Sequence, residues 1–235
     1  MIYLTGDTHG ELGRFASNKF PEGKNLTKND VVIIVGDFGM LWSRAPSRSE
    51  VYWLNWLSEK PWTTLFLDGN HENFDRIDSL EENTLFGGRV GRVTSSIFHL
   101  KRGEVYDIDS NRFFVFGGGK SIDKAMRVPG ISWWDRELPN YMEYKNGLHH
   151  LARYSHEVDY ILTHDAPNSI YDEMDKKYGL IKTGNFDLPK FLEKVRITTS
   201  FKRWYFGHFH FNDTFDEKFS CLYHAVVQLG QKPNV

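Results

Sequence analysis

Short apolar runs in this sequence are followed, at several places, by residues that bind metal ions or transfer protons. The runs span residues 1–5, 31–35, 63–67, 160–163 and 203–207. The residues that follow them are Asp7, His9, Asp37, Asn70, His71, His164, His208 and His210. A pair such as His208 and His210, taken alone, is more often two surface or core residues without a ligand role than a pair of metal ligands. Five run ends that all carry such residues, usually beside glycine, favour a common site instead.

The chemistry of this set suits divalent metal ions. Three of the residues offer oxygens (Asp7, Asp37, Asn70) and four offer imidazole nitrogens (His9, His164, His208, His210). Such ligands fit borderline or hard ions, and the single cysteine, Cys221, excludes a thiolate site. Seven ligands are too many for one tetrahedral ion but enough for two ions that share a carboxylate. Two ions roughly 3.5–4 Å apart hold a bridging water, lower its pKa and bind the oxygens of a displacement at phosphorus.

The elements that must position these residues are buried strands. The apolar runs are continuous rather than alternating, which is typical of strands covered on both faces. A further run at 112–118 predicts another strand, and residues 90–116 as a whole read as consecutive strands with short turns. Because the carboxyl ends of strands in an open α/β sheet form ligand sites, the polar residues are expected to meet at one edge.

Helical patterns lie between several of the strands. Residues 47–61 predict a helix with a capping box formed by Ser47 and Glu50 and an apolar stripe of Val51, Leu54 and Leu57. Residues 140–155 predict a second helix with a stripe of Tyr141, Tyr144, Leu148 and Leu151. Residues 187–195 predict a third, capped by Asp187, with Pro189 in its first turn. Alternating helices and buried strands indicate a layered α/β domain.

The bulk composition is that of a globular protein. The 235 residues are 40% hydrophobic and 26% charged, enough to fill and cover one core, so we expect a single domain over residues 1–235. A net charge of −2 gives no overall attraction to nucleic acid or to an anionic membrane. The first residues, MIYLTGD, do not read as a signal peptide, and no apolar run approaches the roughly 20 residues of a membrane helix. We therefore expect a cytoplasmic protein with no membrane partner.

The ordered series GDTHG (6–10), GDFG (36–39), GNHE (69–72), THDAP (163–167) and GHFH (207–210) resembles the calcineurin-like metallophosphoesterase superfamily. The motifs of that superfamily read D-x-H, G-D, G-N-H-[DE], a lone His and G-H-x-H. All five are present in order, and they span residues 6–210. The resemblance implies a four-layer αββα sandwich, with two mixed β-sheets flanked by helices and the metal ions at the strand ends.

The resemblance also implies a role for each residue. Asp7, His9 and His210 would hold the first ion, Asn70, His164 and His208 the second, and Asp37 would bridge the two. His71 resembles the residue that protonates the leaving oxygen, a role that suits an imidazole near neutral pH. A bridging hydroxide would be the nucleophile. Manganese is the ion we favour, and iron, zinc and nickel remain alternatives.

The second motif departs from the protein-phosphatase branch of the superfamily. In that branch it continues G-D-x-x-D-R-G, where the later Asp orients the catalytic His and the Arg binds phosphate. Here Met40 and Leu41 stand in those positions. Asp75 is a candidate for the orienting role. The departure argues against a standard Ser/Thr protein phosphatase.

Basic residues outside the motifs are candidates for binding the substrate. The segment 117–137 places Lys120 and Arg127 after three glycines, and Arg44 follows the second motif. Trp133 and Trp134 fit a core better than a nucleobase-stacking surface. The expected function is that of a metal-dependent phosphoester hydrolase, a phosphatase. The alternatives are a phosphodiesterase acting on nucleotides or nucleic acid and, in another class, a metal-binding scaffold with weak catalysis.

Overall fold

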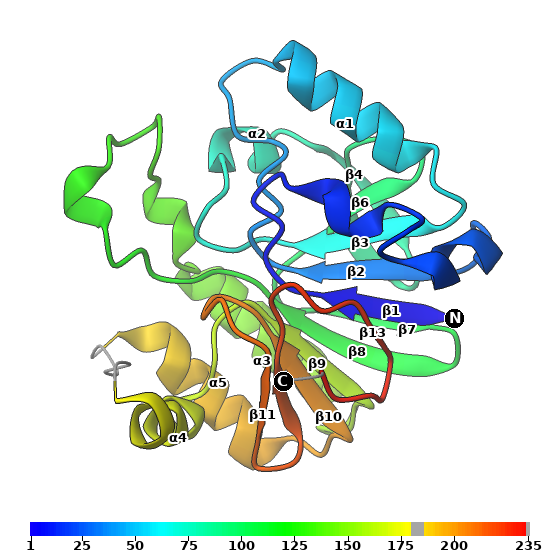
Figure 1. The fold of residues 1–235 in the computed structure, drawn as a ribbon. Helices are drawn as coiled ribbons and strands as arrows, with labels where there is room; N and C mark the ends of the chain where they lie inside the picture. The colour runs from blue at the N-terminus through cyan, green and yellow to red at the C-terminus, as the bar shows by residue number, and fades with distance from the viewer. Residues whose placement is uncertain (180–185, 234–235) are drawn as a thin grey trace.

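Two mixed β-sheets lie face to face between two layers of helices (Figure 1). The computed structural model describes residues 1–179 and 186–233. The first sheet has seven strands in the order β13-β1-β2-β3-β6-β5-β4, and the second has six in the order β11-β12-β10-β9-β8-β7. The α/β class and the flanked two-sheet arrangement expected from the sequence are confirmed.

Each sheet has a parallel centre and antiparallel edges. In the first sheet β1 (Ile2–Thr5), β2 (Val31–Val35), β3 (Thr63–Leu67) and β6 (Ile97–Leu100) run parallel, and β4 (Glu81–Leu85), β5 (Gly88–Arg92) and β13 (Val227–Gln228) pair antiparallel. In the second sheet β8 (Asn111–Phe116), β9 (Tyr160–Thr163), β10 (Arg203–Phe206) and β12 (Phe219–Cys221) run parallel, and β7 (Glu104–Ile108) and β11 (Asp213–Phe215) pair antiparallel. The parallel strands therefore bring their carboxyl ends to one edge of each sheet.

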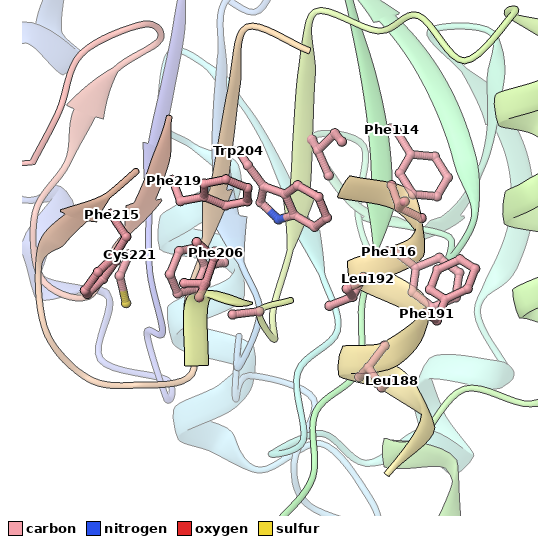
Figure 2. Close-up of a cluster of buried hydrophobic side chains, with 14 of the residues drawn as sticks. Phe114, Phe116, Leu188, Phe191, Leu192, Trp204, Phe206, Phe215, Phe219 and Cys221 are labelled. Carbon is pink, nitrogen blue, oxygen red and sulfur yellow. The ribbon is translucent and has the colours of Figure 1, made fainter. Parts of the chain in front are cut away.

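Three hydrophobic clusters fill the three interfaces between the four layers. Alternate residues of one strand point to opposite faces, so Ile33 of β2 lies in the cluster between the sheets, whereas Ile34 lies in the cluster under the helices of the first sheet. Likewise Phe113 of β8 faces the first sheet and Phe114 faces the helices of the second. Figure 2 shows this last cluster, in which Phe116 lies beside Phe191. Burial on both faces explains why the strands read as continuous apolar runs.

The helices divide between the two outer faces. The first sheet is covered by α1 (Arg48–Ser58), α2 (Phe74–Asp78) and the 3-10 turns Leu12–Phe15 and Pro21–Asn25. The second sheet is covered by α3 (Tyr141–Arg153), α4 (Asn168–Tyr178) and α5 (Asp187–Thr198). Two further 3-10 turns, Lys124–Met126 and Asp135–Glu137, lie in the β8–α3 connection, which projects from the body as the green excursion in Figure 1. No helix within the described ranges combines the length and the apolar character needed to cross a bilayer.

Some details of the expected helices are wrong. Val51 is exposed because the buried face of α1 is centred on Trp53 and Leu57, and Val51 lies about 200° from Trp53 around the helix. Tyr141 is exposed as the first residue of α3, one turn before the part that packs. Asp187 is the first helical residue of α5 rather than its cap, which is Phe186.

The capping box expected at α1 is only half formed. The Ser47 side chain accepts the Glu50 backbone N–H at 3.1 Å, but the Glu50 carboxylate forms an ion pair with Arg76 of α2. The helix α4 was not anticipated from the sequence, nor were β4 and the strands after residue 210. Their apolar positions are few, so the hydrophobic pattern does not indicate them.

Candidate metal centre

The polar residues that follow β1, β2, β3, β9 and β10 converge at the carboxyl ends of these strands. The first three strands belong to one sheet and the last two to the other. Since the sheets are stacked, the loops that leave both of them meet over the same edge. The site is therefore assembled from both sheets of the sandwich.

One group of potential ligands consists of Asp7, His9, Asp37 and His210. Each offers a ligand atom, and these atoms all lie within 4.8 Å of one another. Nε2 of His9 lies 3.0 Å from Nε2 of His210, which in turn lies 3.1 Å from an oxygen of Asp7. The two carboxylates are buried, whereas the two rings are accessible from solvent. An ion of suitable size can be reached by all four side chains.

A second group surrounds Nε2 of His164. This atom lies 3.1 Å from Oδ1 of Asn70, 3.2 Å from Nδ1 of His208 and 3.5 Å from Oδ1 of Asp37. The other ring nitrogen of His164, Nδ1, is held by the Val35 carbonyl oxygen at 3.0 Å. Because Nδ1 faces that carbonyl, it carries the proton and leaves the Nε2 lone pair directed into the group.

Asp37 lies between the two groups. Its Oδ1 is the oxygen near His164, and its Oδ2 lies 3.7 Å from Nε2 of His9. The Oδ1 atom also accepts the backbone N–H of His71 at 2.7 Å, which fixes the carboxylate in this orientation. One oxygen thus faces each group, as a bridging ligand requires.

Glycines beside the ligands allow this close approach. A Cβ atom on Gly36 would lie 2.0 Å from the His164 ring, and one on Gly207 would lie 2.2 Å from an oxygen of Asp7. Any larger residue at either position would displace a potential ligand. The glycines that accompany the motifs therefore make room for side chains that come from the opposite strand ends.

Several of these residues have a left-handed backbone. The φ angles are 46° at His9, 47° at Asp37, 73° at His208 and 55° at His210. Non-glycine residues seldom adopt positive φ, and the cost is tolerated mainly where the side chain must be aimed at a functional site. No sequence pattern predicted positive φ at these positions.

The charges of the two groups favour the binding of a cation. Burial lowers the pKa of the His164 imidazole, but the carboxylates of Asp37 and Asp7 outweigh burial and raise that pKa to about 10. Burial would raise the pKa of Asp37, yet His164 and the other imidazoles hold it far below its usual range. Two buried carboxylates thus favour the protonated, positively charged form of the buried His164 ring. A divalent ion would supply this positive charge between the carboxylates and leave the ring nitrogen as a ligand, so the donor set fits the metal expected from the sequence.

His71 lies at the rim of the two groups, next to a guanidinium. Its Nε2 is 3.3 Å from an Nη of Arg127, which Asp123 holds by two hydrogen bonds of 2.6 and 2.7 Å. Burial lowers the pKa of His71 to about 4, and Arg127 adds to this effect against the opposing charge of Asp37. A phosphoester anion beside the ring would favour its protonated form.

The other two substrate-binding candidates, Lys120 and Arg44, are exposed. Lys120 is exposed, with its Nζ 4.8 Å from the centre of the Phe186 ring, although its neighbour Gly119 lines the site. Arg44 is exposed and, within the described residues, forms no hydrogen bond or ion pair that links it to the two groups. The structure thus brings Arg127 to the site, and it does not bring Arg44 there.

Asp75 is the candidate for orienting His71. Its carboxylate accepts the indole N–H of Trp134 at 3.0 Å, and among the described residues no hydrogen bond joins it to His71. Trp133 and Trp134 are buried, as their expected core role requires. Met40 and Leu41 are buried in the cluster under the helices of the first sheet.

Some supporting residues were missed by the sequence analysis. Ser121 and Glu137, both buried, form a hydrogen-bonded chain to the amide of Asn70. Arg14 donates to the Asp7 carbonyl oxygen at 2.7 Å, and the ring of Tyr223 stacks on His210 at 4.7 Å. Neither spacing nor composition distinguishes these residues from ordinary polar or aromatic ones. The carboxylate of Glu72, the last residue of the GNHE motif, accepts the Phe38 and Gly39 backbone N–H groups.

Comparison with known proteins agrees with this arrangement. The chain is 24% identical, over 242 residues, to the lariat debranching enzyme of Saccharomyces cerevisiae, in a match that covers 89% of this chain and 56% of the relative. The chain thus spans little more than half the length of that relative. The family model described as calcineurin-like phosphoesterase matches residues 1–212, which include both groups of potential ligands. The chain therefore belongs to the calcineurin-like phosphoesterase family.

Proposed function

We propose that this protein is a metal-dependent phosphatase that uses two divalent ions. Asp7, His9 and His210 would hold one ion, Asn70, His164 and His208 the other, and Asp37 both. The observation that carries the proposal is the orientation of Asp37, whose two oxygens face the two groups. When bound, the ions would supply positive charge at the phosphoryl oxygens and lower the pKa of the attacking water. Manganese is the ion we favour.

Two side chains beside the two groups, His71 and Arg127, would carry out proton transfer and substrate binding. His71 donates a proton to the departing oxygen, since its ring lies 5.2 Å from the ring of His9 and its backbone N–H is bound to Asp37. Arg127 binds the phosphoryl oxygens, because its guanidinium is already held toward His71 by Asp123. Lys120 and Arg44, being exposed, would contact only the outer part of a substrate.

A second candidate is a phosphodiesterase that acts on nucleotides or nucleic acid. The observation that favours it is the relative named for debranching lariats, although this chain covers only 56% of that protein. The third candidate, a metal-binding scaffold with weak catalysis, draws on the loss of the orienting Asp at position 40.

A panel of substrates separates the three candidates. Purified protein with added manganese should hydrolyse aryl and alkyl phosphate monoesters. Preference for diesters or oligonucleotides would favour the second candidate, and activity on neither class would favour the scaffold. Asp37→Asn should abolish activity and reduce metal content, whereas Asp75→Asn, which keeps an acceptor for Trp134, should do neither. Full activity of Asp37→Asn would overturn the assignment.

A further inference from the structure

Ser121 and Glu137 close the neck of the excursion between β8 and α3. The Gly119 N–H donates to the Glu137 carbonyl oxygen at 3.2 Å, and the Ser121 N–H donates to Oε1 of Glu137 at 3.2 Å. The Ser121 hydroxyl donates to Oε2 of the same carboxylate at 2.6 Å. Both side chains are buried, so the carboxylate depends on these donors in place of water.

The neck also contacts a residue of the metal centre. Nδ2 of Asn70 lies 3.1 Å from Oγ of Ser121, and its Oδ1 faces Nε2 of His164. A Cβ atom on Gly119 would lie 3.2 Å from Oδ1 of Asn70 and 2.9 Å from the His164 ring. The backbone of the neck therefore lies directly against two residues of the second group.

The direction of each hydrogen bond follows from the chemistry of the groups. An ionised carboxylate only accepts, so the Ser121 hydroxyl must use its single proton toward Glu137. The hydroxyl oxygen is then left as an acceptor, and among the described residues the NH₂ of the Asn70 amide donates to it. A flipped amide would bring Oδ1 against Oγ with no proton between them. The chain thus admits one orientation of Asn70, with its oxygen toward His164.

We propose that Ser121 and Glu137 are positioning residues that hold the amide oxygen of Asn70 toward the second ion. The inference rests on the proposed function, because it assumes that the second group binds an ion. The 117–137 excursion would then have two roles, because it positions Asn70 through Ser121 and also places Arg127 beside His71. Groups that orient a metal ligand typically change metal affinity 10–100-fold when they are removed.

Titration with manganese(II) alone tests the proposal. Calorimetry on metal-free wild-type protein should resolve two ions, and electron paramagnetic resonance should show the spin coupling of a manganese pair. In Ser121→Ala and in Glu137→Gln, one ion should bind about 10–100-fold more weakly while the other keeps its affinity. At limiting manganese the coupled signal should be replaced by that of isolated ions.

The control is Ser96→Ala, which removes an equally buried hydroxyl that donates to the Ser58 carbonyl oxygen at the other end of the strands. This variant should bind both ions as the wild type does. The proposal is overturned by wild-type affinity for both ions in Ser121→Ala and Glu137→Gln, by equal weakening of both ions, or by the same loss in Ser96→Ala. Wild-type protein that binds fewer than two ions would overturn the proposed function itself. Circular dichroism of each variant separates these outcomes from misfolding, and the isosteric Glu137→Gln guards against a packing defect at Ser121.

Discussion

The Nε2 atoms of His9 and His210 lie 3.0 Å apart, although 201 residues separate the two histidines in the chain. Two neutral imidazoles cannot present lone pairs to each other at this distance without a proton or another cation between them. Oxygens of Asp7 and Asp37 lie near the same two nitrogens. The fold thus gathers the electron pairs of two imidazoles and two carboxylates at a place where one bound cation can satisfy them together.

Removal of metal should therefore destabilise the protein. Binding to the native state alone contributes RT ln(1 + [L]/Kd), about 4 kcal/mol when the free ion is at 1,000 times its Kd. A chelator should lower the thermal midpoint, and manganese should restore it. The restoring effect should shrink as the pH falls from about 7.5 to about 5.5, because protons compete with manganese for ligands such as His210, whose pKa the hydrogen bond to Asp7 raises above the ordinary value of about 6.5.

Differential scanning fluorimetry with and without manganese measures this effect. His210→Ala should reduce the manganese-induced shift, and His149→Ala, a change at an exposed histidine of α3, should not. A shift that is the same at both pH values, or that survives in His210→Ala, would contradict the assignment of these ligands.

The positions of the site were predictable from the sequence because the motifs coincide with strand ends. Asp7, Asp37 and Asn70 follow strands that consist of continuous apolar residues, a pattern that predicts burial on both faces. Parallel pairing then brings their ends together, whatever the details of the helices. That residues 1–235 form one domain and that the protein is cytoplasmic stay predictions.

The surroundings of the site were not predictable in the same way. Ser121 and Glu137 are 16 residues apart in a segment without regular periodicity, and only the folded neck brings them to Asn70. Asp75 is a candidate to orient His71, and the sequence could not show that its carboxylate accepts the indole N–H of Trp134, which lies 59 residues further along the chain. Such contacts depend on loop geometry, which no local pattern encodes.

Replacement of His71 should separate catalysis from metal binding. His71→Ala should keep its metal content, because the ring is not among the groups that face the proposed ions. Loss of a general acid costs about 10²–10⁴-fold in rate. The loss should be large for an alkyl phosphate and small for an aryl phosphate, whose leaving group needs little protonation. Turnover of both substrates and metal analysis measure this, and an equal loss for both would argue that His71 does not act as the acid.

Replacement of Arg127 should impair the use of substrate without removing metal. A charge-assisted hydrogen bond contributes about 1.5–3 kcal/mol, so Arg127→Ala should lower kcat/KM by about 10–150-fold. Arg127→Lys should not restore it, because one ammonium cannot reach both Asp123 and a phosphoryl oxygen with the geometry of a guanidinium. Lys124→Ala, in the same excursion and exposed, is the matched control. Unchanged steady-state kinetics in Arg127→Ala would remove Arg127 from the site.

The last prediction concerns the buried ion pair of Asp68 and Arg102, directly before the GNHE motif. Asp68 accepts hydrogen bonds of 2.8 Å from both Arg102 and His99. Burial would raise the pKa of Asp68, but Arg102 and His99 outweigh it and hold that pKa well below its ordinary value. The folded state therefore favours the ionised carboxylate. This stabilisation is fully present above the unfolded pKa of about 3.9 and is lost as the pH falls below it.

Arg102→Met should leave a buried carboxylate without its main partner, at a cost of about 3–5 kcal/mol in the free energy of unfolding at pH 7. The difference in the free energy of unfolding between this variant and the wild type should become smaller as the pH falls through about 4, because protonation of Asp68 removes the unpaired charge. Arg112→Met breaks a largely exposed pair with Asp107 and should cost about 1 kcal/mol or less. Urea unfolding of the three proteins at pH 7 and pH 4 gives these values. A difference that stays constant with pH would mean that the variant loses packing alone, and that Asp68 owes its ionisation to His99.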